Sequence, residues 1–136
     1  MNIKKELLKN QTVLLKMQSI DYNKDIVKVM KELSGEKVIY VTLNKTYESL
    51  KELFGKRKIN LKNVIFIDGI SKTIKQTPEN SDYCFYINSP GAFTELSLTI
   101  SKLLKYKFEY LIFDSLNSFL VYEKKAPVSK ILQSLI

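Results

Sequence analysis

The stretch Val38-Ile39-Tyr40-Val41 decides the fold class, because four apolar residues follow one another without the polar alternation of a half-exposed strand. Continuous runs of β-branched and aromatic residues are typical of strands that are buried on both faces of a parallel sheet. Similar runs at Val64-Ile65-Phe66-Ile67 and Tyr110-Leu111-Ile112-Phe113 predict two more such strands. The shorter run Thr12-Val13-Leu14-Leu15 and the stretch from Tyr83 to Ile87 predict a further strand each.

Amphipathic stripes separate these runs and predict helices. Apolar side chains recur in each stripe at the spacing of one helical face, with polar side chains opposite. Gly35 and Gly55 are interpreted as the stops of the first two helices, and Ser89-Pro90 as the cap and first residue of the third. Strands that alternate with such helices predict an α/β fold of three layers, α/β/α, around a mainly parallel sheet. The stripes lie at residues 24–34, 47–54, 96–104 and 128–135.

The composition is that of one globular domain, residues 1–136, since 45% of the residues are apolar and 26% are charged. No apolar run approaches the roughly 18 residues of a membrane span, and the N-terminus lacks the apolar core of a secretory signal. We therefore expect a cytoplasmic protein without membrane contact. The chain has no histidine and one cysteine, which excludes histidine-dependent triads and argues against a structural zinc site. Cys84 lies in an apolar run and is expected to be buried.

The charge balance is basic, with 22 Lys and Arg against 14 Asp and Glu, a formal charge of +8. Arg57 is the only arginine, and base readout favours the planar fork of arginine over lysine. Any association with nucleic acid is therefore expected to be weak and non-specific. The densest basic cluster surrounds a predicted helix end, where the macrodipole favours positive charge in any case. It consists of Lys51, Lys56, Arg57, Lys58 and Lys62.

Polar residues follow the predicted strands, at the edge of the sheet where α/β proteins bind ligands. The most informative segments are Val38-Ile39-Tyr40-Val41-Thr42-Leu43-Asn44-Lys45, Phe66-Ile67-Asp68, Ser89-Pro90 with Thr94-Glu95-Leu96-Ser97, and Phe113-Asp114-Ser115-Leu116. In order and spacing they resemble the RecA/KaiC-like branch of the P-loop ATPases. They look most like an archaeal group of KaiC-like proteins described as ATPases of signal transduction. The resemblance covers residues 12 to 136, and a flavodoxin-like or Rossmann-like sheet is the alternative.

The resemblance aligns Gln18-Ser19-Ile20-Asp21-Tyr22-Asn23-Lys24-Asp25 with the phosphate-binding loop of the family. A working loop needs two glycines, a lysine and a Ser or Thr that binds magnesium. Lys24 stands at the lysine position, but Gln18 and Asn23 replace the glycines and Asp25 replaces the magnesium ligand. Asn23 is a partial substitute, since asparagine tolerates positive φ. The alternative for Lys24 is an ordinary solvated lysine in the first turn of a helix.

Two further elements of the family can be compared. RecA/KaiC-like ATPases keep a glutamate just after the second strand to polarise the attacking water, and the matching residues here are Asn44 and Lys45, neither of which can accept a proton at neutral pH. Asp114, followed by Ser115, matches the aspartate that holds magnesium through water. The alternative for Asp114 is a cap of the following turn, and Asp68 is likewise expected to shape a turn.

These comparisons predict a degenerate RecA/KaiC-like domain that acts as a non-catalytic binding or regulatory module. The resemblance implies ATP with magnesium as the ligand, but the losses predict weak or absent binding, so no cofactor is expected. An ATP-binding protein or slow ATPase with an altered loop is one alternative, and a nucleic-acid-associated protein is the other. A complete RecA-like core has further strands after the helix that follows Asp114. We therefore expect a truncated core with an open sheet edge beside the Thr12–Met17 strand, and a homo-oligomer or a protein partner.

Overall fold

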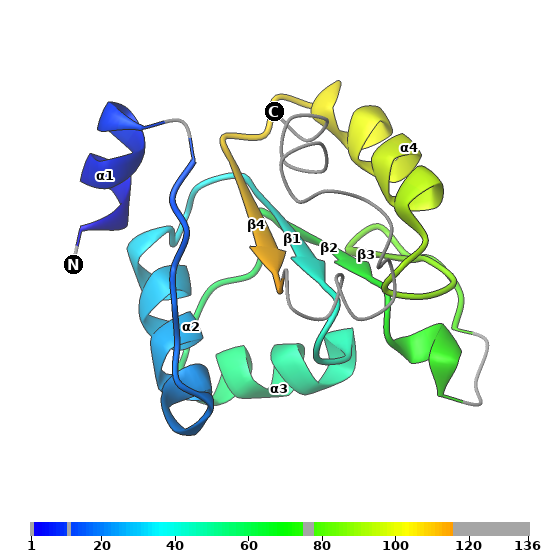
Figure 1. Ribbon diagram of the computed structural model, residues 1–136, viewed down its shortest axis with the longest axis horizontal. Helices are drawn as coiled ribbons and strands as arrows, with labels where there is room; N and C mark the ends of the chain where they lie inside the picture. Colours follow the sequence, from blue (N-terminus) through cyan, green and yellow to red (C-terminus); the bar gives the residue numbers. More distant parts are fainter. Residues whose placement is uncertain (1, 11, 75–77, 116–136) are drawn as a thin grey trace.

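A computed structural model of the chain describes residues 2–10, 12–74 and 78–115. Within them, four parallel strands form one sheet in the order β3-β2-β1-β4 (Figure 1). The strands are Val38–Thr42 (β1), Val64–Asp68 (β2), Cys84–Tyr86 (β3) and Tyr110–Asp114 (β4). The predicted α/β class and parallel sheet are confirmed. The helices are Ile3–Lys9 (α1), Tyr22–Glu32 (α2), Tyr47–Lys56 (α3) and Phe93–Leu104 (α4), with short 3₁₀ helices Ser19–Asp21 (η1) and Ser71–Thr73 (η2).

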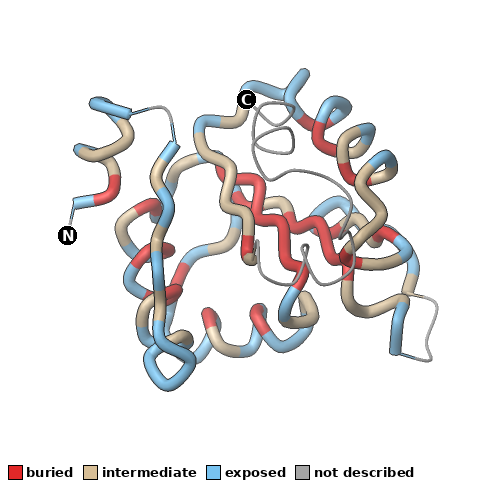
Figure 2. The backbone as a smooth tube through the Cα atoms, in the orientation of Figure 1, coloured by how far each residue is buried: buried red, intermediate tan, exposed pale blue. Residues whose placement is uncertain are grey.

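Helices cover both faces of the sheet, because alternate residues of each strand point to opposite sides. On one face, Tyr40 and Phe66 pack against buried residues of α2 and α3, such as Met30 and Phe54. On the other face, residues of β1 and β2 pack against α4. Figure 1 shows α4 across the sheet from α2 and α3, and Figure 2 shows the buried residues concentrated along the central strands. The second core contains Ile39, Val41, Leu43, Ile67, Ile87, Leu96, Ile100 and Leu103.

The register of the sheet brings two aspartates to the same end of the sheet, the one formed by the carboxyl ends of the strands. Thr42, the last residue of β1, pairs with Asp68 of β2 on one side and with Asp114 of β4 on the other. All three side chains are buried, with Asp68 and Thr42 at 0% and Asp114 at 7% exposure. The candidate site therefore lies at this end of the sheet, where the carboxyl ends of the three strands meet.

The predicted strand at Thr12–Met17 is not part of the sheet. The segment is extended but carries no strand pairing, and β4 occupies the edge next to β1. Its side chains alternate instead, so that Leu14 is 67% exposed while Leu15 and Met17 pack against the core that contains Met30 and Tyr40. Burial of one side of the segment accounts for its apolar run. Within the described residues the sheet has two edge strands, β3 and β4, and self-association through an open edge stays a prediction.

Helix ends differ from the expected stops at two places. Gly55 lies inside α3, which ends instead in a Schellman motif: the Ile59 N–H donates to the Phe54 carbonyl at 2.9 Å and the Lys58 N–H to the Gly55 carbonyl at 3.1 Å. Buried Ile59 supplies the apolar contact of this motif, and Lys58 takes the left-handed conformation with φ 58°. The motif, rather than the glycine, therefore ends the helix.

At the second place, Ser89-Pro90 forms a turn rather than the cap of α4. The Ala92 N–H donates to the Ser89 carbonyl at 3.2 Å, and the helix begins only at Phe93. The predicted stripe of α4 is correct except at its end, where Leu104 is 53% exposed.

Gly35 follows α2 with φ 85°, as expected for a helix stop, and Cys84 is fully buried. The sequence pattern does not predict helix α1, which begins at Ile3 after the N-cap Asn2, whose side-chain oxygen accepts from the Lys5 N–H at 3.0 Å. The helix predicted at 128–135 lies outside the described residues. None of the helices that the structure describes is long and apolar enough to cross a lipid bilayer.

Candidate functional site

A buried carboxylate at the end of β4 is the centre of the candidate site. Asp114 Oδ2 accepts hydrogen bonds from two phenols, that of Tyr22 at the start of α2 and that of Tyr40 in β1, the latter at 2.6 Å. Because Thr42 lies opposite Asp114, Tyr40 is the diagonal neighbour two residues earlier on the same face, within reach of a long aromatic side chain. Three elements that are distant in sequence thus meet at one oxygen atom.

Both phenols are neutral donors at physiological pH. Burial raises the pKa of Tyr22 and that of Tyr40 well above the ordinary value of a phenol, and the nearby charge of Asp114 raises both further. A carboxylate oxygen offers about two lone pairs for hydrogen bonds. Both acceptor positions of Asp114 Oδ2 are therefore occupied by the protein itself.

The ammonium group of Lys45 lies against Tyr22. Its Nζ donates to Asn23 Oδ1 at 2.7 Å and lies 5.2 Å from the ring centroid of Tyr22, a cation–π distance. The loop after β1 holds the lysine there, because Thr42 Oγ1 donates to the Lys45 carbonyl at 2.5 Å and accepts from its N–H at 3.2 Å. Lys45 therefore contacts both Tyr22 and Asn23 in the first turn of α2.

The segment predicted as a phosphate loop folds as the entry to a helix. Gln18 is extended and exposed, Ser19 begins η1, and residues 23–25 lie in the first turns of α2. Asn23 is therefore helical, and its predicted role as a substitute glycine with positive φ is wrong. Among the described non-glycine residues, positive φ occurs only at Lys58 and Lys107. The nest of N–H groups that cradles a phosphate requires left-handed residues, and this segment provides none.

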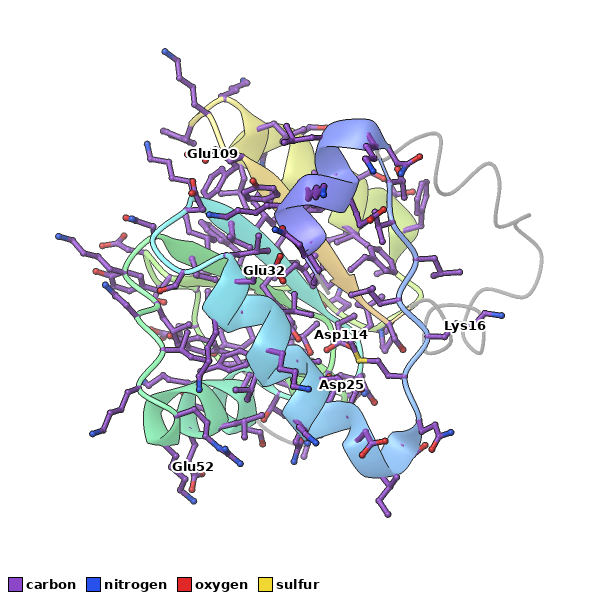
Figure 3. All side chains as sticks on the ribbon, turned by 90° about the vertical axis from the view of Figure 1, so that its left-hand side faces the viewer. Lys16, Asp25, Glu32, Glu52, Glu109 and Asp114 are labelled. Carbon is purple, nitrogen blue, oxygen red and sulfur yellow. The ribbon has the colours of Figure 1, made fainter. Side chains whose placement is uncertain are left out.

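The structure brings some predicted site residues together and separates others. Asn23 joins Asp114 indirectly, through Lys45 and Tyr22. Lys24 is exposed to solvent, and Asp25 is half-buried on α2. Figure 3 labels Asp25 on α2 and Asp114 at the end of β4. Ser115 is half-buried and follows Asp114 through a cis peptide bond. Within the described chain, no group of three or more acidic or cysteine side chains is arranged to hold a metal ion.

Asp68, the buried aspartate at the carboxyl end of β2, shapes the turn after this strand as predicted. Its Oδ1 accepts from the Ile70 and Ser71 N–H groups at 2.7 and 2.8 Å, and its Oδ2 from the Tyr47 N–H and the Ser71 hydroxyl at 2.8 and 2.5 Å. Four donors satisfy the carboxylate and also tie the start of α3 to β2. This aspartate is a structural residue.

Tyr22 and Tyr40 are the site residues that the sequence did not reveal. Tyr40 was interpreted only as a sheet residue, and Tyr22 only as part of the aligned loop. The register offers the one available signal, since a tyrosine two residues before the end of β1 faces the same side as the last residue of the neighbouring strand. Tyr22 comes from 92 residues away along the chain, and no local pattern points to it.

Comparison with known proteins adds no relative. No protein-family model matches the chain, and no curated protein or solved structure is significantly similar to it.

Proposed function

We propose that this chain is a degenerate RecA/KaiC-like domain that acts as a non-catalytic binding or regulatory module and has lost most or all of its nucleotide affinity. Three features support the proposal. The sheet is parallel, an aspartate ends the strand next to β1, and the segments that resemble the family lie at the carboxyl ends of the strands. In parallel sheets of this kind, ligands bind beyond the carboxyl ends of the strands.

The observation that carries the proposal is the occupation of Asp114 by two phenols. To bind a hydrated magnesium ion through Oδ2, the carboxylate would have to release the hydroxyls of Tyr22 and Tyr40. Tyr40 is 1% exposed, so its hydroxyl would lose a charged acceptor that bulk water does not reach, and would keep only the Tyr22 hydroxyl beside it. Losing a hydrogen bond to a charged group costs about 1.5–3 kcal/mol, which opposes magnesium binding at Oδ2.

The absence of a catalytic base supports the same proposal. Asn44 is exposed and cannot accept a proton, and the Lys45 ammonium is engaged with Asn23 and Tyr22. The alternative, a slow ATPase with an altered loop, requires magnesium to bind through the other carboxylate oxygen of Asp114 or to displace the phenols from Oδ2, and it requires a different group to act as the base. Self-association, or a protein partner, is part of the proposed role of a binding module.

Steady-state ATP hydrolysis in the presence of magnesium tests the proposal. We expect phosphate release by the purified protein to equal that of buffer, and Asp114→Asn to give the same rate. A turnover of roughly 1 per second or faster, within the usual range of enzymes, would contradict the proposal if Asp114→Asn abolished it.

A further inference from the structure

Basic side chains gather at the end of the sheet opposite to Asp114. Here α3, α2 and α4 end and their loops lead into β2, β1 and β4, three adjacent strands. Figure 3 shows the two ends of β4, with Glu109 at its beginning and Asp114 at its end. We call this surface the basic rim. Its members are Lys31, Lys37, Lys56, Arg57, Lys58, Lys62, Lys102, Lys105 and Lys107.

The three loops of the basic rim form one continuous surface, because hydrogen bonds connect each to the next. Asn63 joins the loops before β2 and β1: its side chain donates to the Gly35 carbonyl at 3.0 Å and its carbonyl accepts from the Val38 N–H at 3.1 Å. The Lys37 carbonyl joins the loops before β1 and β4, accepting from the N–H groups of Glu109 and Tyr110 at 2.9 and 3.2 Å. The loops that carry the lysines are therefore held in a fixed order across the sheet.

The positive charge of the described chain is concentrated on this rim. Its helix ends and loops carry nine basic side chains against three acidic ones, Glu32, Glu36 and Glu109, whereas the other described residues carry nine basic and ten acidic ones. One of the three acids is paired, since Lys4 Nζ lies 3.0 Å from Glu36, and one rim lysine is paired, since Lys56 Nζ lies 3.1 Å from Glu52. A field of one sign over a continuous surface attracts a polyanion.

The helix macrodipole explains only part of the rim. It favours cations in the last turn of a helix, which accounts for Lys31, Lys56 and Lys102. The other six basic residues lie beyond the helices, in the loops.

Lys58 and Lys107 have φ values of 58° and 59°, a left-handed conformation that glycine adopts at lower cost. Local preferences are most often violated where a residue has a function. At these two positions the rim therefore carries a charge that the backbone geometry does not itself require.

An exposed aromatic ring lies within the rim. Tyr106 is 70% exposed and stands between Lys105 and Lys107 in the loop before β4. We propose that the basic rim binds single-stranded nucleic acid, with the lysines along the phosphates and Tyr106 stacked on a base. Aromatic rings among basic side chains are the usual platform for such strands, and stacking is tolerant of sequence. This inference goes beyond the proposed function and does not depend on it.

The distribution of charge predicts the path of the bound nucleic acid across the rim. The segment before β3 carries Glu79 and Asp82, which would repel phosphates, and β3 lies at the far edge of the sheet. The bound nucleic acid should therefore cross from the loop before β2 to the loop before β4. With Arg57 as the only arginine, binding should show no preference for a base sequence.

Fluorescence anisotropy of a labelled oligothymidylate tests the inference on the full chain. We expect binding at about 50 mM salt that weakens steeply toward 200 mM, because each phosphate contact contributes about 0.7 to the salt slope on a single strand. The double variant Lys58→Gly with Lys107→Gly should bind roughly tenfold more weakly and lower the slope by about 1.4. It should unfold at the same or a higher urea concentration, since glycine relieves both left-handed residues. The charge-matched control, Lys5→Gln with Lys28→Gln outside the rim, should bind like the parent chain.

Tyr106→Ala should weaken binding roughly tenfold, the lower part of the range for stacking on one base, whereas Tyr83→Ala, an exposed tyrosine outside the rim, should change nothing. The inference is overturned if no oligonucleotide binds at about 50 mM salt, or if the charge-matched control loses as much affinity as the rim variant. It is also overturned if duplex binds as tightly as single strand with no effect of Tyr106→Ala, or if vesicles containing phosphatidylserine bind and the oligonucleotide does not.

Discussion

Asp114→Ala is expected to lower the free energy of unfolding by about 2–4 kcal/mol, because it removes the acceptor shared by two phenols. The hydroxyls of Tyr22 and Tyr40 both donate to Asp114 Oδ2, and alanine leaves them without that partner. Tyr40 is 1% exposed, so water cannot replace the lost acceptor. Urea denaturation followed by far-UV circular dichroism measures the change, as a lower midpoint at an unchanged slope.

Asp114→Asn is the matched control for this experiment. The amide keeps one oxygen acceptor in a side chain of nearly the same shape, so we expect less than half the loss caused by alanine. If alanine and asparagine destabilise the chain equally, the charge of Asp114 rather than its hydrogen bonds holds the site together. If Asp114→Ala has no effect on the midpoint, the phenols do not depend on this carboxylate, and the account of the site is wrong.

Phe54→Ala is expected to cost about 3–5 kcal/mol, the range for removing a large aromatic side chain from a core. Phe54 is fully buried on α3, and its ring meets that of Tyr40 edge-on with 6.0 Å between the centroids. Tyr40 in turn contacts Phe66 at 5.3 Å. The cavity left by alanine would therefore also loosen the tyrosine that holds Asp114.

Leu8→Ala provides the control for this prediction, since Leu8 on α1 is 88% exposed and its substitution should change the midpoint little. Urea denaturation of both variants gives the comparison. A loss below about 1 kcal/mol for Phe54→Ala would mean that α3 does not pack on β1 as described, because even modest cavities in a core cost more than that.

The part of the fold that the sequence predicts well is the part set by short-range pattern. Continuous apolar runs identify β1, β2 and β4, since only a strand covered on both faces needs apolar side chains at every position. Helices α2 and α3 follow from apolar residues at helical spacing, and the turn role of Asp68 follows from its place between a strand and a glycine. In each case, neighbours along the chain carry the information.

The part that could not be predicted depends on contacts between distant segments. The apolar run at 12–17 has the composition of a strand, but it does not join the sheet, because β4 pairs with β1 on that side. No local pattern shows which of the two segments pairs with β1. Tyr22 and Tyr40 are ordinary helix and strand residues until the register brings them to Asp114, 92 and 74 residues away. For Lys24 the sequence leaves two possibilities, a phosphate-binding lysine and a solvated lysine in the first turn of a helix, and the structure places it exposed in the first turn of α2.

Isothermal titration calorimetry with ATP and magnesium tests most directly whether the site has lost its nucleotide. The occupied Asp114 Oδ2 and the helical segment at 18–25 predict no saturable heat beyond dilution at nucleotide concentrations where a working P-loop protein is saturated. The same result is predicted for Asp114→Asn. A saturable heat with a stoichiometry near one, dependent on magnesium and lost in Asp114→Asn and in Lys24→Ala, would contradict the account and identify the chain as an ATP-binding protein with an altered loop.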